Sequence, residues 1–185
     1  FKLTGSQALV RYSTANQEKT INAGVHFGNQ RFASFTNITF SKFEDLMQGK
    51  NGVDSIMKLW KKNFIVEQYY GKDSMVTNPD PYKQVATGYN QLDLLQKLSF
   101  RQNERITHKL NLQLSNSSDI PRYDRLTETS NGIAKNAEWY YGPQFRTLAA
   151  YTLEARQLKG FFNDLNATLS HQHWTESRNN RSFQK

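Results

Sequence analysis

The chain has no cysteine among its 185 residues and only four prolines. Without cysteine, neither a disulfide framework nor a thiolate zinc site is available. Long apolar runs are missing too, and no stretch approaches the roughly 20 apolar residues of a transmembrane helix. Hydrophobic residues make up 37 % of the sequence, below the ~45–50 % of typical soluble domains. These absences disfavour a disulfide-stapled domain, a helical membrane protein and a conventional globular core.

The common short motifs of catalysis are absent as well. The sequence has no Gly-rich phosphate loop, no nucleophile elbow and no His-Glu-x-x-His. We therefore expect no enzymatic activity and no cofactor. His171 and His173 would place two imidazoles on one side of a strand, a spacing compatible with a metal. A pair of wall residues explains them better, so we predict no metal site.

Aromatic residues and positive charge are what the sequence has in excess. Aromatics reach 13 %, and the formal net charge is +8. Three interpretations of this charge remain open: a nucleic-acid partner, an anionic surface such as lipopolysaccharide, or a segment whose charge differs from that of its whole protein. Lysine and arginine are spread along the chain without a dense cluster, which disfavours nucleic acid.

The main pattern is alternation of apolar and polar residues with a period of two, the pattern of a β-strand with two different faces. In Tyr89–Arg101, for example, four of the six even positions are leucine or phenylalanine, and the odd positions are mostly polar. The expected strands cover Ser6–Thr14, Ile21–Phe27, 33–40, Tyr89–Arg101, 109–114, Trp139–Arg156 and Asp164–Glu176. The sequence thus predicts an all-β, antiparallel protein with about seven long strands.

Connections between these strands differ sharply in length. Short turns are expected at Gly28–Arg31, Gln102–Arg105 and Gln157–Gly160, and a short link at Asn16–Lys19. The connections after Phe43 and Ser115 are far longer than the ~4–6 residues usual in compact domains. We expect the first of these, Glu44–Lys83, to contain no strands and to form a short amphipathic helix over Asn51–Asn63.

Long strands with polar residues at their centres, joined by alternately short and long connections, are typical of outer-membrane β-barrels. Such barrels have short periplasmic turns and long extracellular loops. A soluble β-sandwich also alternates and is the alternative. Its strands are usually only about 5–6 residues long, so the residues favour the barrel.

Two places stand out as candidate contact sites. Asp119–Leu126 combines Pro121 with Arg122, Asp124 and Arg125, which can pair locally, while Tyr123 can pack beneath them. This segment is either a loop-ordering motif just above the membrane or a ligand-contact patch. The second place is His26, on the predicted lumen side, where it either joins a polar network or contacts a ligand.

Several stretches carry a family resemblance. They are Val10–Asn16, Phe32–Thr36 with Ser41–Leu46, Gly88–Lys97, Leu112–Leu126 and Glu176–Arg181. The most specific is Ser-Asn-Ser-Ser-Asp-Ile-Pro-Arg-Tyr-Asp-Arg-Leu, which ends at Leu126. Through them the chain resembles part of the barrel of a TonB-dependent outer-membrane receptor of the Bacteroidetes type, related to haem, haemoglobin and siderophore receptors.

The resemblance implies residence in the outer membrane of a Gram-negative bacterium, as about a third of a 22-stranded barrel. It implies uptake of a scarce, bulky ligand, such as an iron source, driven by the TonB–ExbB–ExbD complex. Residues 1–185 would be part of the barrel domain, with the plug, the TonB box and the closing strand outside this sequence. The chain departs from haem receptors because it has no Phe-Arg-Ala-Pro motif with a neighbouring histidine.

Two alternatives to a receptor stay open. One is a passive porin or structural barrel of the outer membrane. The other is a soluble basic β-protein that binds polysaccharide or nucleic acid. For a receptor, and equally for a porin or structural barrel, outer-membrane lipid and lipopolysaccharide are expected partners. We also expect the segment by itself to be an open sheet, whose two unpaired edges are unfavourable in lipid.

Overall fold

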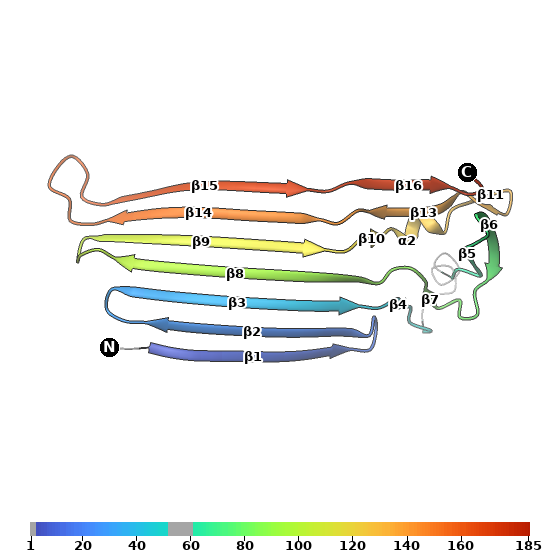
Figure 1. The fold of residues 1–185 in the computed structure, drawn as a ribbon, viewed down its shortest axis with the longest axis horizontal. Coiled ribbons are helices and arrows are strands. Elements are labelled where there is room, and N and C mark those ends of the chain that lie inside the picture. Colours follow the sequence, from blue (N-terminus) through green and yellow to red (C-terminus); the bar gives the residue numbers. More distant parts are fainter. Residues whose placement is uncertain (1–2, 52–60) are drawn as a thin grey trace.

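The computed structural model describes residues 3–51 and 61–185. Its main element is one antiparallel sheet with the strand order β1-β2-β3-β8-β9-β14-β15 (Figure 1). These strands are β1 Leu3–Ser13, β2 Glu18–Gly28, β3 Phe32–Phe43, β8 Tyr89–Arg101, β9 Ile106–Ser117, β14 Phe145–Ala155 and β15 Leu165–Thr175. The expectation of an all-β, antiparallel chain with about seven long strands is confirmed.

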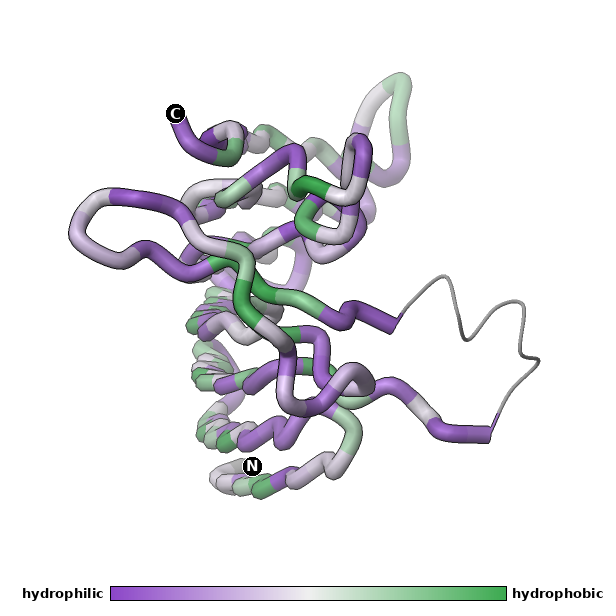
Figure 2. Tube along the Cα trace, turned by 90° about the vertical axis from the view of Figure 1, so that its right-hand side faces the viewer, coloured by the Kyte–Doolittle hydropathy of each residue, from purple (hydrophilic) through white to green (hydrophobic). Residues whose placement is uncertain are grey.

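The sheet is open and consists of a single layer. Viewed along the strands, it forms one stack of strands with the N-terminus at one edge (Figure 2). β1 and β15 are its edge strands, and the described residues do not close into a barrel. Within those residues, no helix has the length and apolar character needed to cross a membrane.

The connections are arranged as expected from their lengths. The turns after β2, β8 and β14 all lie at one end of the sheet, which we call the turn end (Figure 1). The long connections lie at the other end, the loop end, together with the short link between β1 and β2. Asn29 and Asn103 order two of the turns, because each side-chain oxygen accepts hydrogen bonds from backbone N–H groups two and three residues later.

Trp139–Arg156 is not the single strand that the alternation predicts. It divides into β13 (Asn136–Tyr141) and β14 (Phe145–Ala155). Pro143 cannot donate a backbone hydrogen bond. Gly142 lies so close to the adjacent segment between β15 and β16 that an added Cβ would lie 2.2 Å from Ser177 Oγ. Proline and this close approach together interrupt the ladder.

The expectation that Glu44–Lys83 lacks strands is wrong. This connection contains a hairpin, β5 (Phe64–Tyr69) and β6 (Lys72–Thr77), and the two-residue pair β4 (Leu46–Met47) with β7 (Lys83–Gln84). The hairpin turns at Tyr70 and Gly71, both with positive φ, as a tight two-residue turn requires. The helix expected over 51–63 falls mostly on residues 52–60, which lie outside the described residues.

The second long connection contains short elements that extend the sheet. They are β10 (Ile120–Pro121), α2 (Tyr123–Leu126), β11 (Thr129–Ser130) and β12 (Ile133–Ala134). β10, β13 and β16 (Arg178–Ser182) form a three-stranded sheet at the loop end, in line with the long strands (Figure 1). The four-residue helix α2 packs on β13.

Burial of hydrophobic side chains is sparse and lies mostly at the loop end. The buried hydrophobic side chains of the described residues are Tyr123, Leu126, Ala134 and Ala155, and the first three belong to the loop end. Large apolar side chains of the sheet are instead exposed, with Val10 at 80 %. Both faces of the sheet are thus available for contact with surroundings outside this chain.

Candidate functional site

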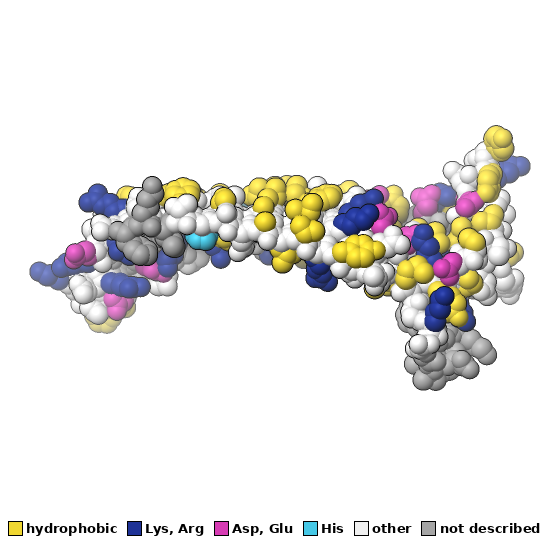
Figure 3. All heavy atoms as spheres, turned by 90° about the horizontal axis from the view of Figure 1, so that it is seen from below, with side chains coloured by type: hydrophobic (Ala, Val, Ile, Leu, Met, Phe, Trp, Pro, Cys, Tyr) yellow, Lys and Arg dark blue, Asp and Glu magenta, His cyan; other side chains and the backbone are white. Residues whose placement is uncertain are grey.

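The sheet has one apolar face, defined by the row in which Ala8, Ala23, Ile38, Leu94 and Leu114 stand opposite one another on successive strands. Side chains alternate along each strand, so every second residue joins this face. Figure 3 shows the sheet edge-on, with hydrophobic atoms gathered along one side. Exposed apolar surface on this scale marks contact with a partner or with lipid.

Aromatic side chains lie at both ends of the apolar face. Phe40 and Phe145 lie toward the loop end, and Phe27, Phe100 and Tyr151 toward the turn end, all exposed. Between them the face is mainly aliphatic. On β3, Phe32 and Phe40 are eight residues apart, which corresponds to about 26 Å along a strand. Two aromatic belts therefore bound an aliphatic band.

Polar groups within the band satisfy one another. Thr36 Oγ1 donates to Gln96 Oε1 at 2.5 Å, and Gln96 Nε2 donates to Ser34 Oγ at 3.0 Å. This network lowers the cost of placing polar side chains on an apolar surface. His171 and His173 lie on the same face, since their partners on β14 are Ala149 and Thr147. Among the described residues, no cluster of three or more His, Cys, Asp or Glu is placed to hold a metal.

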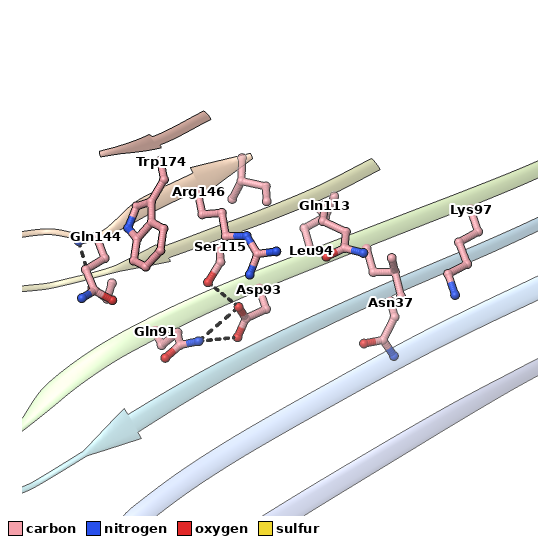
Figure 4. A pocket seen from close by; sticks show the side chains of 13 residues that line it. Asn37, Gln91, Asp93, Leu94, Lys97, Gln113, Ser115, Gln144, Arg146 and Trp174 are labelled. Carbon is pink, nitrogen blue, oxygen red and sulfur yellow. Dashed lines mark hydrogen bonds between the residues drawn. The ribbon is translucent and has the colours of Figure 1, made fainter. Parts of the chain in front are cut away.

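The opposite face is polar and contains a hollow of about 470 Å³ near the loop end (Figure 4). Its lining side chains that carry polar groups come from five strands and the Gly142–Gln144 break: Asn37, Gln91, Asp93, Lys97, Gln113, Ser115, Ser117, Gln144, Arg146 and Trp174. Strand register brings four of these residues together on one row across the sheet. Asp93 stands opposite Ser115, Ser115 opposite Arg146, and Arg146 opposite Trp174.

Within the hollow, Asp93 is the organising acceptor. It accepts hydrogen bonds from Gln91 Nε2 at 3.0 and 3.1 Å and from Ser115 Oγ at 2.6 Å. Lys97 and Arg146 make no ion pair with any described residue, and Trp174 is 60 % exposed. Amides, two cations and an open indole ring suit reversible binding of polar ligands.

His26 lies on this polar face, as predicted, but not in the same hollow. It lines a second depression of about 510 Å³ with Phe35, Lys97, Lys109 and Asn111. Its ring sits over Gly5 of the neighbouring strand, where an added Cβ would lie 2.6 Å from the imidazole. The residue at position 5 therefore determines whether the His26 ring can lie there.

The Arg122–Arg125 group lies at the loop end, away from His26. Arg122 Nη2 and Nε contact the two oxygens of Asp124 at 2.5 and 3.0 Å. This pairing lowers the pKa of Asp124 and raises that of Arg122. Arg125 contacts Glu128 at 2.6 Å. Tyr123 is buried, and burial raises its pKa to about 12. The local pairs expected from the sequence are present.

Two loop-end groups have no signal in the sequence. The first places Trp139 and Tyr141 between Arg122 and Arg178, with ring centroids 4.9–5.9 Å from the guanidinium carbons. The second is an ion-pair group in which Arg181 contacts both Asp73 and Glu138. Both depend on residues from distant segments that meet only because β10, β13 and β16 pair.

No protein-family model, curated protein or solved structure matches this chain. The functional argument therefore depends on the residues, their arrangement in the sheet, and the resemblance described from the sequence.

Proposed function

We propose that this chain is a membrane-spanning part of the wall of a TonB-dependent outer-membrane receptor that imports a scarce, bulky ligand. The observation that carries the membrane assignment is the uncovered apolar face with an aromatic belt near each end. In water, exposing that face would be unfavourable by about 25 cal/mol per Å². In a barrel wall, the apolar face contacts lipid and the polar face contacts the water-filled lumen, so each face meets surroundings of its own polarity.

Strand length supports the same proposal. The seven main strands have 11 to 13 residues. Strands of about 9–11 residues suffice to cross a membrane at a tilt near 45°. At strand tilts of about 35–45°, the ~26 Å between Phe32 and Phe40 along β3 projects to about 18–21 Å on the membrane normal, somewhat less than the apolar band of about 25 Å in outer-membrane barrels.

The receptor part of the proposal rests on the resemblance, above all on the stretch that ends at Leu126. Import would be driven by TonB–ExbB–ExbD acting outside this segment, and an iron source such as haem, haemoglobin or a siderophore is the expected ligand class. The polar hollow around Asp93 and Arg146 would then face the lumen. A passive porin has the same kind of β-strand wall but needs no energy from TonB.

Membrane orientation is tested by site-directed labelling of the complete protein, which this segment supports well because it has no cysteine of its own. Spin labels at L94C, L112C and Y151C are expected to contact lipid in vesicles, shown by relaxation enhancement from oxygen. L95C is the matched control, because Leu95 is a leucine on the polar face. Equal lipid contact at positions 94 and 95 would refute the wall assignment.

The transport assignment has a separate test. Cells with and without the gene are grown on haem, haemoglobin or siderophore-bound iron as sole iron source, in strains with and without TonB. Gene-dependent growth that also requires TonB supports a receptor. Gene-dependent uptake that persists without TonB would favour the passive porin.

A further inference from the structure

The polar hollow carries more positive than negative charge. Among the residues that line it, Lys97 and Arg146 are cations and Asp93 is the only acid. Both cations are exposed, and neither makes an ion pair with a residue that the structure describes. On the same face of the sheet, by contrast, Lys109 contacts Glu154 at 2.5 Å. Charge-assisted hydrogen bonds from the two unpaired cations would favour an anionic ligand.

Asp93 adds a second requirement, because one of its oxygens can still accept a hydrogen bond. A carboxylate offers about four acceptor sites, two on each oxygen. Asp93 Oδ1 accepts from Gln91 and Ser115, whereas Oδ2 accepts only from Gln91 among the described residues. The remaining site on Oδ2 suits a donor from the ligand, such as a hydroxyl group. A simple carboxylate ion has no such donor.

Trp174 provides an apolar surface beside these polar groups. It is 60 % exposed and stands opposite Arg146 on the neighbouring strand. In ligand pockets, aromatic side chains supply contact area while a few polar groups fix the orientation of the ligand. An open indole next to a guanidinium therefore suits a ligand that has C–H groups on one side and polar groups at its rim, as sugars do.

The hollow is long enough for a ligand of more than one unit. Its volume of about 470 Å³ lies within the ~300–1,000 Å³ of ligand pockets. Three strand spacings separate Asp93 from Trp174 across the sheet, which corresponds to about 14 Å. The Gln113 side chain lies between those of Arg146 and Lys97 (Figure 4), so an amide is available between the two cations.

We propose that this hollow binds a ligand that carries both carboxylate and hydroxyl groups. Arg146 and Lys97 bind carboxylates of the ligand. Asp93 Oδ2 accepts from a hydroxyl, and Trp174 contacts C–H groups. Two sources supply this chemistry: an acidic oligosaccharide, or a hydroxycarboxylate complex of iron.

The inference deepens the proposed function and rests on it, because the polar face must line the lumen. The short turns of outer-membrane barrels are periplasmic, so the loop end is extracellular in the proposed orientation. The hollow lies near the loop end (Figure 4). An incoming ligand would therefore reach this part of the wall first.

The test measures binding to the complete, purified protein by isothermal titration calorimetry. Digalacturonate and iron(III) gluconate are the two probes, one for each source. Galactobiose has the ring hydroxyls of digalacturonate without its carboxylates, and adipate has two carboxylates without hydroxyls. Both should bind at least about tenfold more weakly than the better probe, because each lacks one kind of hydrogen bond to a charged group.

Variants then assign the binding to the hollow. In R146Q, the affinity for the better probe should fall about tenfold, as for loss of one charge-assisted contact, and R146K should restore part of it. W174A should lower the affinity several-fold, because the apolar contact area is lost. R101Q is the matched control, since Arg101 is an exposed arginine of the strand that carries Lys97 but lies outside the hollow. Unchanged lipid contact of the label at position 94 shows that each variant is folded.

Three results would overturn the inference: neither probe binds, galactobiose or adipate binds as tightly as the better probe, or R146Q binds as wild type does. Tighter binding of digalacturonate assigns the hollow to a saccharide, and tighter binding of iron(III) gluconate assigns it to an iron carrier; either result supports the shared chemistry. If the labels at positions 94 and 95 do not distinguish lipid from lumen, the proposed function itself is wrong. If those labels distinguish the faces and no probe binds, only the ligand inference is refuted.

Discussion

Arg181 Nη1 donates to Asp73 Oδ2 at 2.6 Å, although the two residues lie 108 positions apart in the sequence. The Asp73 side chain is only 1 % exposed, and the backbone N–H of Gln184 donates to the same oxygen at 2.7 Å. Arg181 also contacts Glu138 at 2.8 Å. This contact attaches the β5–β6 hairpin of the first long connection to β13 and β16.

We expect R181Q to release this hairpin, because the substitution leaves a buried carboxylate without its cation. Amide hydrogen exchange in Phe64–Thr77 should accelerate while exchange in the long strands stays unchanged. R125Q is the control, since it removes the more exposed ion pair with Glu128. Unchanged exchange in the hairpin of R181Q would show that the contact does not hold it.

The same contact predicts a response to acid. The hydrogen bond from Arg181 lowers the pKa of Asp73 below its ordinary value. A lowered carboxyl pKa stabilises the folded state above the ordinary pKa, and this contribution is lost as pH falls through the lowered value. Protease cleavage within the hairpin should therefore increase only below about pH 4. In D73N this acid-dependent step should be absent, and its persistence would assign it to another group.

Lys62 predicts a response at alkaline pH. It is 5 % exposed, with its ammonium 5.5 Å from the ring centroids of Phe64 and Tyr123, and burial lowers its pKa to about 8. Between about pH 8 and its ordinary pKa near 10.4, the unfolded chain binds a proton that the folded chain does not, so stability rises with pH.

The increase of loop-end stability with pH should be smaller in K62M than in wild type. Hydrogen exchange from pH 7.5 to 10.5 measures it, as the free energy of loop-end opening. K72M is the matched control, because Lys72 is exposed at the hairpin turn. If K62M and wild type show the same slope, burial of Lys62 does not affect loop-end stability.

Charge placed on the two faces of β9 should have opposite consequences in a bilayer. L112K puts an ammonium at the centre of the aliphatic band and should lower the free energy of unfolding by about 2–4 kcal/mol, the cost of a lysine facing lipid at mid-depth. Q113K is next in sequence but faces the polar hollow, where water is available. Urea unfolding in vesicles gives both values, and similar losses would contradict the orientation of the sheet.

The packing of His26 on Gly5 gives a local prediction. In G5A, the new Cβ would lie 2.6 Å from the imidazole, so the ring must rotate away at a cost of about 1–3 kcal/mol. The His26 ring resonances in NMR should shift. G160A should leave them unchanged, because an added Cβ there meets nothing within 4 Å. Unshifted His26 resonances in G5A would contradict the observed contact.

The sequence by itself determined the long strands, their alternating faces and the positions of the short turns. Tyr89–Arg101 was predicted with the bounds that the structure shows, because polar residues alternate with apolar ones through most of its 13 positions. The local pairs around Arg122 were also predictable, since residues two or three apart in a turn are necessarily close. Each of these features depends on neighbours along the chain.

Only the tertiary structure decided which distant residues meet. The Asp93–Ser115–Arg146–Trp174 row depends on strand register, and a shift of one residue would turn every side chain to the other face. Arg181 reaches Asp73, and Arg178 reaches Trp139, only because the loop-end strands pair. The Gly142–Gln144 break and the Phe64–Thr77 hairpin were missed for a related reason: close approach and pairing partners, not local periodicity, decide where a strand ends.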